Sequence, residues 1–358
     1  MSKMKHRQRY VVRPYEPADR DGVRALHRTV FDQQASREWF DWKYVENPAA
    51  DAAAFVAEAD GEIVGARPFM PFRMAGAGAE TVAFQPADAM VHPDHRRRGL
   101  FTRMTERALE RYADGDPAFC FNFPNERALA GNLELGWEVV DTVPISYRIQ
   151  SAEGFVDGEV QRALADAVAG TYCRVRDRLA PAPDAYDVTR HEEIPADLLA
   201  RLYARNPPEE LHALRDEAFY RWRFRNPRWR YTAYTASRGG STVAAVVVGR
   251  RNKYGTDVAR LTDVLPLVDG DEEAFAALLG RVTDEYADAD VVAATGRAIP
   301  DSLLRRFGFV SDHELPLSAV SEQSTLVARP LGDDESASFG RLTAPENWRL
   351  TFAERDAS

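Results

Sequence analysis

Three consecutive arginines and a glycine stand before an apolar helical pattern in the segment "VHPDHRRRGLF", residues 91–101. A strand that ends in a turn and feeds a helix leaves backbone N–H groups pointing outward, and the helix dipole adds about half a positive charge there. Such a turn binds phosphate groups. Gly99 lets an anion approach the backbone, while Arg96, Arg97 and Arg98 add mobile positive charge. The predicted chemistry is the binding of two neighbouring phosphates, and the alternative is an ordinary basic surface turn.

The sequence predicts strands and helices before and after this loop, and these elements must position it. The strand "ADAMVH" (87–92) runs into the loop, and a helix follows, with apolar residues at helical spacing over three turns. Upstream, a strand at residue 10 leads into an acidic-capped helix, and two further strands meet at the turn Asp60-Gly61. Downstream come the strand "AFCFNF", a helix with Asn125 as its N-cap, and the closing strand "WEVVDTVPISYRI" (137–149).

Two motifs among these elements resemble signatures of the GCN5-related N-acetyltransferase (GNAT) family. The loop is similar to the family's Gln/Arg-x-x-Gly-x-Gly/Ala, with Arg96 first, Gly99 in the centre and Phe101 in place of the small residue. The later helix is similar to Asn-x-x-Ala-x-x-x-Tyr-x-x-x-Gly-Phe. Its matching positions are Asn125, Ala128, Asn132, Gly136 and Trp137. Both motifs occur in the family's order, with the expected strands between them.

The resemblance covers residues 10–150 closely and 188–320 loosely, and it implies an α/β (α+β) fold of two tandem GNAT-like domains. Each domain would have a mixed, mostly antiparallel central sheet flanked by helices. Acetyl-CoA would be the cosubstrate, an amine would attack its thioester directly, and no metal would be needed. The residues that the resemblance assigns to coenzyme binding are Ala89, Val91, Arg96, Arg97, Arg98, Gly99, Leu100, Phe101, Thr102 and Asn125.

The sequence identifies the catalytic acid and base less clearly than it identifies the coenzyme loop. The family often uses the tyrosine of the second motif to protonate the departing thiolate, and Asn132 in that place cannot act as an acid. Asp88 is the first candidate for the base, and His92 beside the loop is another. Strand alternation points Asp88 away from the coenzyme, so it reaches the acceptor only if the strand bulges. The alternatives are a structural role that Asp88 shares with Asp263 of "LTDVLP", and an ordinary loop position for His92.

An internal repeat indicates two copies of one architecture. "WFDWKYVENP" at 39–48 returns as "FYRWRFRNP" at 219–227, and each copy precedes two strands around a Gly-containing turn. "LGW" at 135–137 is answered by "FGF" at 307–309, again between a helix and a strand. Because the aromatic residues of the first segment recur in the second, packing is their predicted role. The alternative is an aromatic wall for a cationic acceptor.

The second copy lacks the basic loop. Its corresponding helix follows the acidic run "DGDEE" (269–273), which would satisfy the helix dipole internally and repel pyrophosphate. The expected domains are a catalytic acyl-CoA-binding GNAT domain over 1–150, a connecting helix and Pro/Ala linker over 151–187, a degenerate GNAT-like domain over 188–330 and a C-terminal tail over 331–358. The tail is either frayed or docked through Trp348, Leu350 and Phe352. This arrangement resembles tandem family members such as Eis-type acetyltransferases and mycothiol synthase.

The charge and composition of the chain limit the kinds of partner that it is expected to bind. The net charge is −10, and only Lys3, Lys5, Lys43 and Lys253 among the 46 basic residues are lysines. An acidic surface argues against non-specific binding to nucleic acid or anionic membranes and suits a cationic acceptor. The longest apolar run, "TVAAVVVG", is too short to span a bilayer. Two cysteines without metal-type spacing, together with an N-terminus that lacks an apolar segment, favour the cytoplasm.

The expected function is therefore an acyl-CoA-dependent N-acyltransferase that moves an acetyl group to a primary amine of a small molecule or peptide. A non-catalytic acyl-CoA-binding or scaffolding protein is the main alternative, because the family's tyrosine is missing and the base is unassigned. Transfer of an aminoacyl group from charged tRNA is a further alternative, which the acidic balance and the complete loop both disfavour. The acceptor, the acyl chain length and the oligomeric state have no signature in the sequence.

Overall fold

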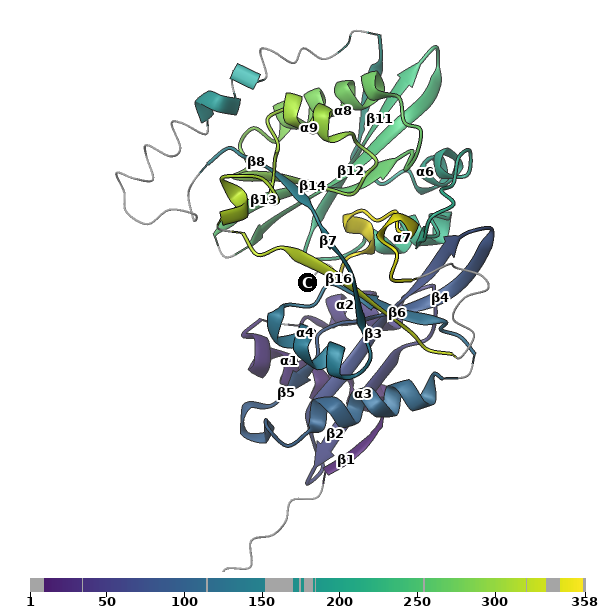
Figure 1. The fold of residues 1–358 in the computed structure, drawn as a ribbon, viewed down its shortest axis with the longest axis vertical. Helices are drawn as coiled ribbons and strands as arrows, with labels where there is room; N and C mark the ends of the chain where they lie inside the picture. Colours follow the sequence, from purple (N-terminus) through teal and green to yellow (C-terminus); the bar gives the residue numbers. More distant parts are fainter. Residues whose placement is uncertain are drawn as a thin grey trace, which may run out of the picture. The chain divides into compact units, whose positions relative to one another are not determined.

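The computed structural model describes residues 10–33, 35–113, 115–151, 170–173, 175–176, 183, 185–253, 255–319, 321–332 and 342–356. The chain divides into two compact units (Figure 1). The first unit comprises the described residues within 1–74, 79–140 and 326–343, and the second those within 75–78, 141–325 and 344–358. The connecting helix and linker expected over 151–187 lie largely outside the described residues.

The first unit is built on a mixed sheet with strand order β1-β2-β3-β4-β6-β16-β7, and the short β5 pairs with β3. Its strands are β1 (Tyr10–Pro14), β2 (Ala53–Ala59), β3 (Glu62–Gly76), β4 (Ala79–Pro86), β5 (Met90–Val91), β6 (Phe119–Asn122), β7 (Glu138–Val143) and β16 (Ser324–Pro330). Its helices are α1 (Arg20–Phe31), α2 (Arg37–Phe40), α3 (Leu100–Arg111) and α4 (Glu126–Glu134), with a π-helical turn η2 (Asp41–Val45) after α2. β4 and β6 run parallel, and β1, β2 and β3 pair antiparallel.

Local sequence chemistry explains several of these elements. Asp60 and Gly61, with φ of 53° and 84°, form the left-handed turn that joins β2 to β3. Asn125 caps α4, because its side-chain oxygen accepts a hydrogen bond from the Ala128 N–H at 3.0 Å. α3 packs on the sheet through a buried apolar stripe that includes Leu100 and Met104. These features of the sequence prediction are confirmed.

The second unit repeats this plan, with strand order β15-β8-β14-β13-β12-β11-β9. Its strands are β8 (Ile145–Ile149), β9 (Asp187–His191), β11 (Arg230–Arg238), β12 (Ser241–Lys253), β13 (Thr256–Leu265), β14 (Val291–Thr295) and β15 (Val310–Ser311), with a short β10 (His212–Ala213). Its helices are α6 (Ala196–Tyr203), α7 (Glu217–Arg223), α8 (Glu272–Glu285) and α9 (Asp301–Arg306). β13 and β14 are parallel, as β4 and β6 are in the first unit, and the other described pairs are antiparallel.

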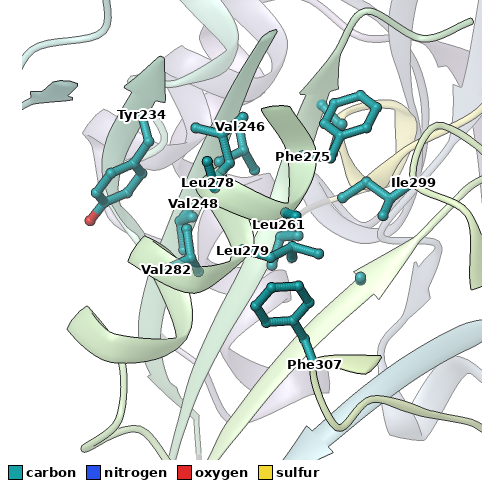
Figure 2. Close-up of a cluster of buried hydrophobic side chains, with 14 of the residues drawn as sticks. Tyr234, Val246, Val248, Leu261, Phe275, Leu278, Leu279, Val282, Ile299 and Phe307 are labelled. Atoms are coloured by element: carbon teal, nitrogen blue, oxygen red, sulfur yellow. The ribbon is translucent and has the colours of Figure 1, made fainter. Parts of the chain in front are cut away.

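The core of the second unit lies between α8 and its sheet. Figure 2 shows Phe275, Leu278 and Val282 of α8 in one cluster with Val246 and Leu261 of the neighbouring strands. All of them are at most 2% exposed. Every residue of α8 from Ala274 to Leu279 is buried, so this helix is part of the core of the second unit. Two units, each with a mixed sheet and helices of its own, agree with the expected tandem α/β (α+β) fold.

The internal repeat is confirmed in detail. The Asn-Pro that ends each aromatic segment makes the same turn, because Asn47 Oδ1 accepts from the Ala49 N–H at 2.9 Å and Asn226 Oδ1 accepts from the Arg228 N–H at 3.0 Å. Gly136 and Gly308, with φ of 86° and 83°, end α4 and α9 in the left-handed conformation that glycine favours.

Two strands lie in different sheets from those expected. "WEVVDTVPISYRI" is not one closing strand, because Pro144 separates β7 from β8, and β8 pairs with β14 and β15 in the second sheet. β16 pairs with β6 in the first sheet and places Val327 in that unit's core. The boundaries of the two units therefore differ from those of the domains expected over 1–150 and 188–330, because β8 belongs to the second unit and most of β16 to the first.

Two further differences concern local structure. The strand expected over 87–92 is limited to Met90–Val91, and the sequence reading did not separate β4 (Ala79–Pro86) from its neighbours. In the described part of the tail, Trp348, Leu350 and Phe352 are 4%, 7% and 4% exposed, so residues 344–356 form a docked arm of the second unit.

Candidate functional site

The basic loop connects β5 to α3 in the first unit. A short 3-10 turn over Pro93–His95 follows β5, and the chain then turns through two left-handed residues, Arg97 at φ 58° and Gly99 at φ 69°. A Cβ built on Gly99 would meet no atom within 4 Å, so this position faces open space. Because only glycine adopts this conformation without strain, Gly99 holds the loop open at the start of the helix.

The helix start leaves a row of backbone donors. The first N–H of α3 that reaches a carbonyl of its own turn is that of Arg103, which donates to Gly99 O at 3.0 Å. Within the described parts of the chain, the amides from Arg97 to Thr102 have no hydrogen-bond acceptor, and no side chain caps the helix at Gly99. Such a row of amides at the positive end of a helix is an anion-binding site.

The three arginines add positive charge around these amides. Arg96 donates from Nε to Val91 O at 3.2 Å, and Arg98 donates from Nη2 to Asp94 O at 3.3 Å while its guanidinium lies 5.6 Å from the Tyr10 ring. In the structure as described, none of the three is paired with a carboxylate, and all three are exposed. Their positive charge is therefore available to a ligand.

A pocket of about 380 Å³ opens beside the loop. Its lining includes most of the residues predicted to bind the coenzyme: Ala89, Val91, Arg96, Arg97, Gly99, Leu100 and Phe101, with Val30 and His95 completing it. Three predicted residues, Arg98, Thr102 and Asn125, are not among the lining residues. Arg98 and Thr102 flank the lined stretch of the loop, whereas the Asn125 side-chain oxygen is already used to cap α4.

The strands part next to this pocket. β4 pairs with β6 through Ala83 and Phe84, but after Pro86 the chain leaves β6, and β5 pairs with β3 on its other side. Asp88 has φ 45°, which breaks the strand alternation at this point. Among the described residues, the N–H and C=O of Ala89 have no hydrogen-bond partner. An extended ligand can therefore pair with this backbone, as β-strands do.

Asp88 is held in a buried ion pair. Its Oδ2 accepts hydrogen bonds from Lys43 Nζ at 2.7 Å and Tyr44 OH at 2.5 Å, and the Lys43 side chain has no exposure. Burial alone would raise the pKa of this carboxyl, but the Lys43 charge and the two hydrogen bonds outweigh burial and lower it. A carboxylate stabilised in this way is a weak proton acceptor.

Asp263 of the second unit occupies a matching environment. Its carboxylate accepts from Arg215 Nε at 3.1 Å and from Tyr220 OH at 3.0 Å, and it is 1% exposed. Each unit thus buries one aspartate beneath a cation and a tyrosine. This recurrence favours the structural role that the sequence reading offered as the alternative to catalysis for Asp88.

The histidines at the loop have ordinary local partners. His92 Nδ1 accepts from the Asp94 N–H at 3.3 Å, and the His92 ring does not line the pocket. His95 lines it, and its Nδ1 lies 3.1 Å from Tyr10 OH. His92 therefore stands at the start of the loop as a partly exposed imidazole, outside the pocket itself.

Cys120 on β6 is 1% exposed, and burial raises the pKa of its thiol to about 12. Because the thiolate is the reactive form, we expect iodoacetamide at pH 8 to leave Cys120 unmodified in the folded protein and to modify it in urea. Peptide mapping by mass spectrometry separates Cys120 from Cys173. Labelling of native Cys120 at the rate of the unfolded chain would contradict this packing role.

The aromatic segment before β2 is packed into the first unit. Trp39, Phe40, Trp42 and Tyr44 are all at most 4% exposed, which supports the packing role predicted from the repeat. The cation on these rings is the protein's own, because Lys43 Nζ lies 5.0 Å from the Trp39 ring and 5.4 Å from the Tyr44 ring. The sequence analysis did not predict that Lys43 would lie against these aromatic rings.

Arg67 on β3 is a second residue that the sequence reading missed. It is 2% exposed, and its Nη2 donates to Asn132 Oδ1 on α4 at 3.4 Å. Its guanidinium lies 4.9 Å from the ring of Phe101, which lines the pocket. The only signal in the sequence was one charged residue inside the apolar run "IVGARPFMPF".

The corresponding helix start in the second unit is closed. Asp271 caps α8, and its Oδ1 accepts from the N–H groups of Glu273 and Ala274 at 2.9 and 3.3 Å. Tyr186 OH donates to the same carboxylate at 2.5 Å. The protein's own anion therefore occupies the place that is open at Gly99 in the first unit.

The described residues hold no cluster of three His, Cys, Asp or Glu side chains arranged to bind a metal ion. Within the same residues, every helix is too short or too polar to cross a bilayer.

Comparison with known proteins agrees with this geometry. Residues 11–140 match the sequence model of a family described as acetyltransferase (GNAT) domain. A GCN5-related N-acetyltransferase from Anabaena variabilis has a similar structure at 11% identity and TM-score 0.63, over 90% of this chain and 73% of that one. Eis1 from Mycobacterium abscessus is similar at 16% identity and TM-score 0.54, over 91% and 74%.

A tandem GNAT protein from the clavulanic acid biosynthesis pathway is similar at 15% identity and TM-score 0.55, over 90% of this chain and 99% of that protein. At such identities these likenesses show the fold. No protein of curated function matches the sequence.

Proposed function

We propose that the protein transfers an acetyl group from acetyl-CoA to a primary amine, because residues 11–140 match the acetyltransferase (GNAT) domain model and the chain has the fold of a tandem GNAT protein. The observation that carries this proposal is the open N-terminus of α3. Its amides from Arg97 to Thr102 have no acceptor within the described residues, and three unpaired arginines stand beside them.

The residues present fit the coenzyme. The amides and arginines of the loop suit a diphosphate, since both supply donors and positive charge to neighbouring phosphate groups. The pocket of about 380 Å³ beside the loop is lined by Ala89, Val91 and Phe101, and the unpaired backbone of Ala89 suits an extended amide-containing arm. The thioester supplies the activated acyl group.

The chain's own contribution is orientation and charge stabilisation. Holding an amine and a thioester in reacting geometry removes much of the entropic barrier, and backbone N–H groups such as that of Ala89 can polarise the carbonyl. Because Lys43 and Tyr44 hold Asp88 as a stabilised carboxylate, we assign Asp88 to structure. His92, with a partly exposed imidazole, remains our candidate for the base.

Only the first unit would bind the coenzyme. The carboxylate of Asp271 caps the helix start that corresponds to Gly99, and it would repel a diphosphate. Two acidic residues, Glu272 and Glu273, follow in the first turn of α8. We propose that the second unit serves the fold of the chain or the acceptor, in keeping with a degenerate copy.

The test is coenzyme release from acetyl-CoA, followed with a thiol reagent in the presence of a panel of primary amines and peptides. We expect release that depends on the amine and acetylated product of matching amount by mass spectrometry. Tight coenzyme binding without release for any amine would instead support the non-catalytic acyl-CoA-binding alternative. Failure to bind coenzyme A at all would remove both assignments.

A further inference from the structure

Arg67 is a buried cation without a counter-ion. In the described structure its one hydrogen bond goes to the neutral amide of Asn132, at 3.4 Å, and its Nε is buried without an acceptor. No carboxylate among the described residues forms an ion pair with it. Its remaining close neighbours are the rings of Phe69 and Phe101, whose centroids lie 5.6 and 4.9 Å from the guanidinium carbon.

This arrangement is costly for the protein alone. A charged group taken out of water destabilises the fold unless an opposite charge or a full set of hydrogen bonds compensates it. Burial lowers the pKa of Arg67 to about 10, so the guanidinium stays charged at neutral pH despite this cost. Buried charges that the rest of the fold does not stabilise are characteristic of functional sites.

The register of the sheet places Arg67 beside the proposed coenzyme arm. On β3, Gly65 pairs with Val91 and Ala66 pairs with Met90, so Arg67 is the next residue and comes opposite Ala89. Ala89 and Phe101 both line the pocket at the loop. Arg67 therefore stands where the chain after β4 leaves β6, at the acyl end of the proposed coenzyme whose diphosphate lies at Gly99.

Two neutral side-chain amides, those of Asn132 and Asn122, lie on the α4 and β6 side of Arg67. Asn132 of α4 donates to Asn122 Oδ1 of β6 at 3.4 Å and accepts from Arg67. The family resemblance puts a tyrosine, the acid for the departing sulfur, at position 132. Asparagine is shorter and cannot supply a proton, and the Arg67 guanidinium lies against its side chain.

We propose that Arg67 binds the coenzyme's sulfur and holds the negative charge that it gains as the acyl group leaves. This assignment rests on the proposed coenzyme site. In the step, the amine nitrogen bonds to the carbonyl carbon, the carbon–sulfur bond breaks, and its electron pair goes to sulfur. The extra proton of the new amide nitrogen passes to the base, for which His92 is the candidate, and from there to water, while the thiolate takes a proton from water after release.

A guanidinium is suited to this task in a dry site. It stabilises charge without giving up its proton, and stabilisation aimed at charge that develops late lowers the barrier directly. The titratable neighbours of Arg67 are Cys120 and Tyr44. With its pKa raised by burial to about 12, the Cys120 thiol stays neutral in the range where a coenzyme thiol titrates.

The experiment measures the affinity of the full chain for coenzyme A and for desulfo-coenzyme A, which lacks the thiol, between pH 6.5 and 9. A cation near the sulfur should lower the pKa of the bound thiol by about 1–3 units below that of the free coenzyme. Coenzyme A affinity should therefore rise about tenfold or more with pH in the wild-type protein, while desulfo-coenzyme A shows no such rise.

Three variants complete the design. Arg67→Met should abolish the pH-dependent gain and lower kcat, while Arg67→Lys should retain part of both. Arg73→Met removes an exposed cation from the same strand, one that pairs with Glu80 at 3.0 Å, and should change neither. Because methionine removes an uncompensated buried charge, the Tm of Arg67→Met should be unchanged or higher, which a merely structural arginine would not allow.

Each unexpected result of these measurements contradicts a different proposal. A wild-type protein that binds neither coenzyme form contradicts the proposed function. A wild-type protein that binds coenzyme A without the pH-dependent gain, or an Arg67→Met variant that keeps the gain, overturns the role of Arg67. A loss in Arg67→Met that is confined to succinyl-CoA, with acetyl-CoA unaffected, would assign Arg67 to an acyl carboxylate and overturn the thiolate assignment.

Discussion

Replacing Gly99 with valine is expected to weaken coenzyme A binding by about a hundredfold or more, measured by isothermal titration calorimetry. Gly99 has φ 69°, where a residue with a Cβ costs about 1–2 kcal/mol. The new side chain would project into the open space in front of the loop amides. Loss of two charge-assisted hydrogen bonds to phosphate adds about 3–6 kcal/mol to the penalty at 1.5–3 kcal/mol each. Each 1.4 kcal/mol is about tenfold in affinity.

Gly61 offers a matched control in the same unit. It has φ 84° in the turn between β2 and β3, and a Cβ there also meets nothing within 4 Å. Gly61→Val should therefore lose a similar amount of stability and keep wild-type affinity for the coenzyme. Wild-type affinity in Gly99→Val would show that the loop is not the coenzyme site, and equal loss in both variants would trace the effect to backbone strain.

Replacing Lys43 with methionine should lower the free energy of unfolding at neutral pH by about 3–5 kcal/mol, because it leaves a buried carboxylate unpaired. The pair lies 2.7 Å apart with side-chain exposures of 0% and 7%. Urea denaturation at pH 7 measures the effect. As a control, Arg73→Met breaks an exposed pair and should change stability by less than about 1 kcal/mol.

The pH dependence of this loss follows from the pKa of Asp88. Burial would raise that pKa, but Lys43 and Tyr44 lower it, so the carboxylate stabilises the wild-type fold above the pKa of unfolded aspartate. That stabilisation disappears as pH falls through the lower folded pKa. Without Lys43, burial raises the pKa of Asp88, and the carboxyl can become neutral at mildly acidic pH. The deficit of Lys43→Met should therefore shrink as the pH falls.

The double variant Lys43→Met/Asp88→Asn tests the same pair from the other side. Asparagine tolerates the left-handed conformation of position 88 and carries no charge, so most of the stability lost in Lys43→Met should return. A double variant as unstable as the single one would mean that Lys43 acts through packing on Trp39 and Tyr44. Unchanged stability in Lys43→Met would contradict the structural role assigned to Asp88.

The sequence could predict the coenzyme loop because its determinants are neighbours in the chain. A glycine that needs positive φ, the arginines beside it and the first turn of α3 all fall within residues 96–103. The Asn125 cap and the Asp60-Gly61 turn were predictable for the same reason. Such local rules depend on backbone conformation and short-range hydrogen bonds, which a few residues decide.

The features that the sequence did not reveal depend on distant partners. Whether β8 pairs with β7 or with β14 is decided by long-range packing, and Pro144 was the only local sign of a break. The ion pair of Lys43 and Asp88 joins a helical segment to a strand end. The surroundings of Arg67 are set by Phe101 of α3 and Asn132 of α4, both distant from it in the chain.

The place of β16 in the first sheet has a consequence for biosynthesis. N-terminal domains generally fold first as the ribosome extends the chain. Here β16 lies between β6 and β7, yet it follows every strand of the second sheet in the chain. The second sheet thus has all its strands before the first one does. During translation β6 and β7 leave the ribosome with open edges, which attract other strands, and the sheet whose strands emerge first is the last of the two sheets to be completed.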